Sequence, residues 1–272
     1  MAFLSLLSLT LTAAPLFAAE APVAPEGPSF TEVKRYQAKE ARQGIAVDAK
    51  HFYAIDNTTI GKYEKDTGKK VAEWNGSAEF PAIHFDGGVV LDGKLYLPHS
   101  NYPQNPMTSS VEIFDAATRK PIGTHSFGIL LGSLTWVDRH DGAWWAVFAN
   151  YSRIFGTDKQ AYGHTHWTSF VKMDDNWNIL QQWVFPLNVL KRSEPMSLSG
   201  GSWGPDGLLY VSGHDHPEVY AMRLPKMGSV LELVKTLPLN IAGQGIAWDR
   251  SKPGTIYGIV RKTNEVVVSE LK

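Results

Sequence analysis

Apolar and polar residues alternate along most of the chain in short stretches that are separated by turn-forming residues. Alternation with a period of two is typical of β-strands with one buried face. Five stretches share one order of features: small residues, an apolar strand, a turn near an aspartate, and a second strand with an aromatic residue. They are GIAVDAKHFYAI from Gly44, GVVLDGKLYLPH from Gly88, SLTWVDRHDGAWWAVFA from Ser133, GSWGPDGLLYVSG from Gly201 and GIAWDRSKPGTIYGIV from Gly245. The pattern therefore predicts an internal repeat.

The repeat has the period of a propeller blade. The turn aspartates are 44, 46, 68 and 43 residues apart, so the third unit carries an insertion. They are Asp48, Asp92, Asp138, Asp206 and Asp249. Two more alternating stretches follow in the units, such as Ile60–Glu64 and Val71–Trp74, which makes each unit a four-stranded antiparallel blade. Five blades around an axis bury the faces that one blade alone would expose. We predict an all-β, five-bladed β-propeller; a β-sandwich is the alternative, but it would not explain the period.

The fifth unit supplies only three strands before the chain ends. The stretch Phe30–Tyr36 belongs to no other unit. We expect it to form the fourth strand of the last blade, because this pairing closes the ring and covers a sheet edge that would otherwise favour aggregation.

The first and last units are the most alike, since they begin Gln43-Gly44-Ile45-Ala46 and Gln244-Gly245-Ile246-Ala247. In this feature the chain resembles the glutaminyl-cyclotransferase-like group of five-bladed propellers, whose units also open with a Gln-Gly-apolar stretch. A weaker likeness is to exported propellers labelled cycloisomerases or lactonases. These resemblances imply the fold, but they transfer no catalytic residue to this chain.

The N-terminus looks like a targeting segment. Residues 3–17 are apolar or hydroxylated and uncharged, and Ala18 and Ala19 follow them. This predicts a cleavable secretory signal peptide at residues 1–19, a Pro-rich linker at 20–28 and the propeller domain at 29–272. A buried N-terminal helix is the alternative. We expect a secreted or periplasmic protein with no membrane span after signal cleavage.

Composition excludes several functions. Lys and Arg number 26 against 27 Asp and Glu, so no net positive charge would attract nucleic acid. Cysteine is absent, which excludes disulfides, thiolate metal ligands and a cysteine nucleophile. No Gly-rich phosphate-binding loop precedes a helical pattern, so we expect no nucleotide cofactor.

The histidines are the main candidates for catalytic or metal-binding residues. Propeller connectivity places the connections between second and third strands on one face, here called the upper face, and five histidines fall in them. A His-x-His pair in an extended backbone points both rings the same way. Such rings would bind a divalent metal (zinc, iron, manganese or calcium) or act as acid and base, with Asp215 orienting an imidazole. Alternatively, each histidine is a solvated loop residue. The predicted catalytic residues are His99, His164, His166, His214, His216 and Asp215, and the predicted metal ligands are His99, His164 and His214.

Other upper-face side chains suggest a ligand. Aromatic rings stack on sugars, amides form neutral hydrogen bonds, and arginine pairs with carboxylates. The predicted substrate-binding residues are Arg153, Asn101, Tyr102, Asn150, Tyr151, Trp167 and Gln244. The upper-face acids, among them Asp56, Asp86 and Asp215, show no obvious carboxylate pair of the kind a glycosidase needs.

We therefore predict a monomeric, exported enzyme that performs hydrolysis, elimination or cyclisation on a small polar substrate, such as a sugar, an acid or a lactone. The alternative is a non-catalytic propeller that binds a carbohydrate, another ligand or a protein partner.

Overall fold

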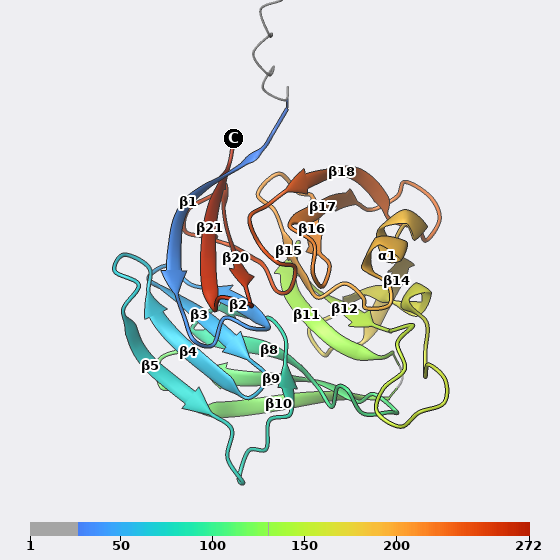
Figure 1. Ribbon diagram of the computed structural model, residues 1–272, viewed down its shortest axis with the longest axis horizontal. Helices are drawn as coiled ribbons and strands as arrows, with labels where there is room; N and C mark the ends of the chain where they lie inside the picture. Colours follow the sequence, from blue (N-terminus) through green and yellow to red (C-terminus); the bar gives the residue numbers. More distant parts are fainter. Residues whose placement is uncertain (1–26, 130) are drawn as a thin grey trace, which may run out of the picture.

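Five small antiparallel sheets surround a common axis (Figure 1), which confirms the predicted five-bladed propeller. The computed structural model describes residues 27–129 and 131–272. The predicted signal peptide and residues 20–26 of the predicted linker lie outside the described residues. Within these two ranges, no helix has the length and apolar character needed to cross a membrane.

Each blade has its first strand nearest the axis. Blade 1 comprises β2 (Gly44–Val47), β3 (His51–Asp56), β4 (Thr59–Glu64) and β5 (Lys70–Asn75). Blade 2 comprises β6 (His84–Phe85) and β7 (Val89–Leu91), then β8 (Lys94–Ser100), β9 (Ser109–Asp115) and β10 (Pro121–Gly128). Blade 3 comprises β11 (Ser133–His140), β12 (Ala143–Ala149), β13 (Ser169–Met173) and β14 (Ile179–Val184). Blade 4 comprises β15 (Gly200–Trp203), β16 (Leu209–Ser212), β17 (Glu218–Arg223) and β18 (Glu232–Pro238). Blade 5 comprises β19 (Ala247–Trp248), β20 (Thr255–Val260), β21 (Glu265–Leu271) and β1 (Phe30–Gln37).

Burial follows the position of a strand in its blade. Every residue of the second strand β12 is buried, whereas the outer strand β5 alternates between half-buried and exposed residues. A strand that is covered on both faces has a continuous run of apolar residues, whereas a strand at the rim alternates between apolar and polar residues. Trp136, Trp203 and Trp248 lie on the inner strands of their blades and are all buried.

Glycines let the inner strands approach one another at the axis. A Cβ atom on Gly44 would lie 2.5 Å from the backbone oxygen of Asp86, and one on Gly245 would lie 2.7 Å from the Cα of Gly44. The amide of Gly245 also donates to the carbonyl of Gln43 at 2.9 Å. The Gln-Gly openings of the first and last units are therefore points where neighbouring blades touch, and any side chain in place of glycine would push the blades apart.

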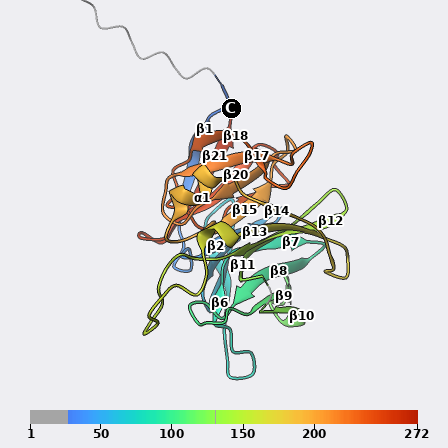
Figure 2. The same ribbon diagram turned by 90° about the vertical axis from the view of Figure 1, so that its right-hand side faces the viewer.

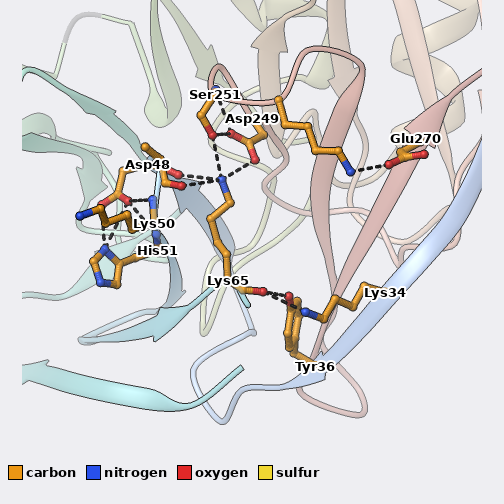
Figure 3. Close-up of polar contacts among 11 residues, drawn as sticks. Lys34, Tyr36, Asp48, Lys50, His51, Lys65, Asp249, Ser251 and Glu270 are labelled. Atoms are coloured by element: carbon orange, nitrogen blue, oxygen red, sulfur yellow. Dashed lines mark hydrogen bonds and ion pairs between the residues drawn. The ribbon is translucent and has the colours of Figure 1, made fainter. Parts of the chain in front are cut away.

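The ring closes where the first and last blades meet. Strand β1 pairs with β21 in antiparallel register from Phe30↔Leu271 to Gln37↔Glu265, as predicted, and the two strands lie side by side in Figure 1. On the lower face, the Lys65 ammonium reaches across from blade 1 to blade 5 (Figure 3). It pairs with the Asp249 carboxylate and donates to the carbonyl of Asp48 at 2.9 Å.

The same lysine also binds the N-terminal strand. Its backbone oxygen accepts hydrogen bonds from the Tyr36 hydroxyl and from the Lys34 ammonium, the latter at 3.0 Å (Figure 3). We call this group of Lys34, Tyr36, Lys65 and Asp249 the seam. It fixes the terminal strand, the first blade and the last blade to one another.

Three local features differ from a plain repeat. The inner strand of blade 2 is interrupted between β6 and β7, at residues 86–88. A short helix, α1 (Leu187–Ser193), joins blades 3 and 4, which the repeat pattern did not predict. The long β12–β13 connection, which holds the insertion of the third unit, contains a 3₁₀ helix, η1 (Thr165–Trp167), and projects from the ring in two perpendicular views (Figures 1 and 2).

Candidate active site

A group of polar residues occupies the upper end of the axis, where the inner strands begin. Residue 86 precedes the axial Gly87, just as Gln43 and Gln244 precede the axial glycines of blades 1 and 5. Asp86 thus stands where these other blades carry a neutral glutamine. The interruption between β6 and β7 leaves it outside the strand ladder, at the centre of the ring.

His84 and Asp86 form a buried pair. The imidazole Nε2 lies 3.4 Å from Oδ1 of Asp86, and the two side chains are only 10% and 5% exposed. Burial alone would lower the pKa of His84, but the charge and hydrogen bond of Asp86 and the charge of Asp56 outweigh it, so the pKa is raised. The second carboxylate oxygen of Asp86, Oδ2, is buried and has no hydrogen-bond partner among the described residues. A buried acceptor without a donor is costly, so this oxygen is suited to accept a proton or a hydrogen bond from a ligand.

Two tyrosines border the pair. The ring of Tyr102 lies 4.8 Å from the ring of His84, and the ring of Tyr151 lies 5.2 Å from that of Tyr102. Burial raises the pKa of Tyr102 and, more strongly, that of Tyr151, and the negative charge of Asp86 acts in the same direction on each. Both phenols therefore keep their protons at neutral pH and can donate hydrogen bonds.

Positive charge approaches from two loops. The charges of Arg153 and Arg261 lower the pKa of Tyr102, whereas burial raises it. Arg261 donates to Nε2 of His214 at 3.2 Å, and Nδ1 of the same imidazole lies 2.6 Å from Oδ2 of Asp215. Burial lowers the pKa of His214, so this imidazole is neutral, with its proton on Nδ1. We define the axial cluster as His84, Asp86, Tyr102, Tyr151, Arg153, His214, Asp215 and Arg261.

The axial cluster contains some of the sequence-predicted residues. The structure brings Tyr102, Tyr151, Arg153, His214 and Asp215 around the pair. Gln244 lies beside them, 2% exposed, with its amide nitrogen 3.4 Å from the backbone oxygen of His214. His216 is half-buried on the same loop as His214.

His99 lies farther from the axis and is held by its own blade. Its Nε2 accepts a hydrogen bond from the amide of Ile83 at 3.0 Å, so Nδ1 carries the proton that faces Ser110 Oγ at 3.1 Å. Burial lowers the pKa of His99, in agreement with a neutral ring. Both ring nitrogens are thus used in holding strand β8 to its neighbours.

The period-two argument for the pair at His164 and His166 was wrong. These residues lie at the start of and within the 3₁₀ helix η1, so the backbone is not extended between them. The ring of His164 packs edge-on against Trp167 at 5.1 Å, whereas Nε2 of His166 lies 3.2 Å from the Glu194 carboxylate. The segment after β16 is also bent rather than extended at residues 214 and 215.

The remaining predicted ligand contacts are in loops. The Asn101 side chain closes a turn, since its amide donates to Pro106 O at 3.0 Å and its oxygen accepts from the Thr108 amide at 2.7 Å. Asn150 and Trp167 line a groove between blades 2 and 3.

The predicted metal ligands do not fit a shared metal ion. No group of three or more His, Asp or Glu side chains suitable for a metal is found in the ranges 27–129 and 131–272. The ring nitrogens of His99 and His214 already have partners, so coordination would require breaking those hydrogen bonds. We therefore derive no step through a metal.

The sequence placed Asp86 on the upper face but gave it no role, and it did not single out His84. Asp86 forms no carboxylate pair of the glycosidase kind; it pairs with the imidazole of His84 instead. In the sequence repeat Gly88 aligns with Gly44 and Gly87 with Gln43, so Asp86 had no glutamine counterpart there. The place of Asp86 before the axial Gly87 is visible only in the structure.

A cleft of about 910 Å³ opens at the seam, on the opposite face of the ring. Its charged side chains pair mainly with each other, as Lys65 does with Asp249 and Lys252 with Glu270. We assign this cleft to ring closure, and the axial cluster remains the candidate active site.

The fold and the axial cluster together define a five-bladed β-propeller with a polar site at one end of its axis. No protein-family model and no curated protein sequence matches the chain. Among solved structures, it is similar to the glutaminyl cyclase of Myxococcus xanthus, with a TM-score of 0.59 and 11% identity over 90% of this chain and 97% of that one. This likeness shows the fold and agrees with the resemblance seen in the sequence.

Two further structures align less well. Hydrazine synthase of Kuenenia stuttgartiensis has a TM-score of 0.45 and 14% identity, over 84% of this chain and 70% of that chain. A chain of the mitotic checkpoint complex has a TM-score of 0.46 and 9% identity, over 96% and 98%.

The raised pKa of His84 predicts a pH-dependent contribution to stability. A histidine whose folded-state pKa lies above its unfolded value of 6.5 stabilises the protein fully below pH 6.5, and this contribution is lost as the pH rises through the folded-state value. We expect the melting temperature of the wild type, relative to His84→Gln, to fall as the pH rises above about 6.5. His99 has the opposite shift, so the corresponding difference for His99→Gln should change on acidification below pH 6.5 instead. A pH-independent difference for His84→Gln would contradict the ion pair.

Proposed function

We propose that this protein is an enzyme that uses general acid–base catalysis at the axial cluster to act on a small polar substrate. The observation that carries the proposal is the unpartnered, buried Oδ2 of Asp86, whose other carboxylate oxygen lies 3.4 Å from the His84 imidazole and helps to raise its pKa. Buried carboxylates and imidazoles in direct contact are typical of catalytic centres, because their proton affinities are set by one another.

Each member of the axial cluster has a chemical role in this proposal. The Asp86 carboxylate accepts a proton from the attacking group of the substrate, and the His84 imidazolium donates one to the leaving group. The phenols of Tyr102 and Tyr151 donate hydrogen bonds to the carbonyl oxygen where negative charge develops. Arg153 is exposed and near Tyr102, which suits it to bind a carboxylate or carbonyl of the substrate.

Of the three predicted reactions, cyclisation is the first to test. The similar Myxococcus protein is named a glutaminyl cyclase, and cyclisation of an N-terminal glutamine requires the groups of the axial cluster. The α-amine nitrogen forms a bond to the side-chain amide carbon, the carbon–nitrogen bond to the amide breaks, and ammonia leaves. The proton released by the amine goes to Asp86, and the proton taken up by ammonia comes from His84.

The test is incubation of the purified protein with a peptide that begins with glutamine, followed by mass spectrometry. We expect a product lighter by one ammonia, formed faster than the spontaneous background. Release of ammonia at the background rate would overturn cyclisation of this substrate class. In that case, lactones and sugar acids, tested for hydrolysis and elimination, decide between a different reaction and the non-catalytic binding alternative.

We also propose that the protein acts outside the cytoplasm, because residues 1–19 have the pattern of a secretory signal. N-terminal sequencing of the protein from the periplasm or medium tests this, and retention of residues 1–19 would overturn it.

A further inference from the structure

A second surface on the upper side has the composition of a ligand site and lies apart from the axial pair. A groove of about 450 Å³ runs between blades 2 and 3. It is lined by Met107, Ile129, Leu131, Gly132, Asn150, Tyr162, Trp167, Ser169 and Gln182. None of these residues is charged. We call this surface the aromatic groove.

Trp167 is the exceptional residue of the aromatic groove. All nine tryptophans lie within the described residues, and Trp167 alone is exposed, at 58%. Tyr162, in the same groove, is 50% exposed. Two large aromatic side chains exposed in one groove indicate a surface that is covered by a ligand when in use.

Hydrogen bonds hold the backbone of Trp167 in place. The backbone oxygen of Trp167 accepts from the Asn150 amide at 3.3 Å and from the Ser169 hydroxyl at 3.0 Å. Its backbone amide donates to the carbonyl of His164 at 2.9 Å, and the His164 ring packs against the indole. Residues on either side, Thr165 and Thr168, are fully buried. Because the backbone of Trp167 is held in this way, the indole is already positioned before a ligand arrives. This reduces the conformational entropy that is lost on binding.

The polar groups of the aromatic groove are amides and hydroxyls. Gln182 Nε2 donates to Ser169 Oγ at 2.9 Å, which orients the glutamine and leaves its carbonyl oxygen without a partner in this contact. Flat rings flanked by neutral hydrogen-bonding groups match a pyranose, whose faces carry C–H groups and whose rim carries hydroxyls. A charged ligand would find no counter-ion in this lining.

We propose that the aromatic groove binds a neutral oligosaccharide, with Trp167 as the stacking platform. This site is separate from the axial cluster. None of the residues that line the groove belongs to the axial cluster, although Met107 packs in an apolar cluster with Tyr151 and Phe155. The proposal does not depend on the reaction assigned to the axis.

The test is titration of the full chain with cellotetraose, maltotetraose and chitotetraose, followed by tryptophan fluorescence and by calorimetry. We expect binding of at least one of the three, weakened about tenfold or more by Trp167→Ala and less by Trp167→Phe, which keeps a flat ring. The matched control is Met227→Ala, a change of a 92% exposed apolar side chain outside the groove, which should bind as the wild type does. Because Trp167 is exposed, its variants should keep the wild-type melting temperature.

Three outcomes would overturn the proposal: no binding of any of the three sugars, equal binding by Trp167→Ala, or binding only of charged oligosaccharides. Binding of an apolar dye that depends on Trp167, without sugar binding, would assign the groove to an apolar partner instead. Asp86→Asn should keep oligosaccharide affinity, so the failure of one proposal is distinguishable from the failure of the other.

Discussion

Replacement of Asp86 by asparagine is expected to reduce turnover of the substrate by about 10²- to 10⁴-fold, the range typical for loss of a general base. Asparagine has nearly the same shape, but its amide cannot accept the proton that the carboxylate Oδ2 is placed to take. The substitution also removes the negative charge that raises the pKa of His84, so the imidazole loses its proton at a lower pH and no longer serves as the acid at neutral pH. The measurement is kcat/KM for ammonia release from the glutamine peptide.

The matched control for this variant is Asp92→Asn. Asp92 is an exposed aspartate in the β7–β8 turn of the same blade, at its lower end. It should leave kcat/KM unchanged. Turnover by Asp86→Asn within about twofold of the wild type would place the chemistry elsewhere, since loss of a general base costs far more than that.

The second large effect is expected at the seam, where Lys65→Met should lower the free energy of unfolding by about 3–5 kcal/mol. The Asp249 side chain is 2% exposed, and the Lys65 side chain is 12% exposed. Removing the ammonium leaves a buried carboxylate without its cation, and this is the costly way to break such a pair. It also removes the hydrogen bond to Ser251 Oγ in blade 5 and the one to Asp48 O within blade 1. Urea denaturation, or a fall of roughly 10 °C in melting temperature, reports the change.

Two variants separate this effect from a general loss of charge. Lys252→Met removes an exposed lysine that pairs with Glu270 nearby, and it should leave stability almost unchanged because surface ion pairs contribute little. The double variant Lys65→Met, Asp249→Leu should recover part of the loss, since no uncompensated charge stays buried. Equal stabilities for Lys65→Met and the wild type would show that the seam does not hold the ring closed.

The fold could be predicted from the sequence because each blade is encoded by a local pattern that repeats along the chain. The spacing of the turn aspartates gave the number of blades, and the unassigned stretch at Phe30 matched the strand missing beside β21. The helix α1 was not predicted, because seven residues in a connection carry too little periodicity to stand out.

The candidate site could be predicted only in part, because side-chain partners depend on local backbone shape. Connectivity placed Tyr102, Tyr151 and His214 on the correct face. It could not show that the His-x-His segment at His164 turns into a 3₁₀ helix, nor that both nitrogens of His99 are already bonded. The pairing of His84 with Asp86 depends on the interruption of the inner strand of blade 2, which the repeat pattern did not indicate.

The most direct test of the axial ion pair is a nuclear magnetic resonance titration of the His84 imidazole in the wild type and in Asp86→Asn. In the wild type we predict a pKa above 6.5, lowered when the carboxylate is replaced. A wild-type pKa at or below 6.5 that does not respond to Asp86→Asn would contradict the pairing, and with it the acid–base site at the axis.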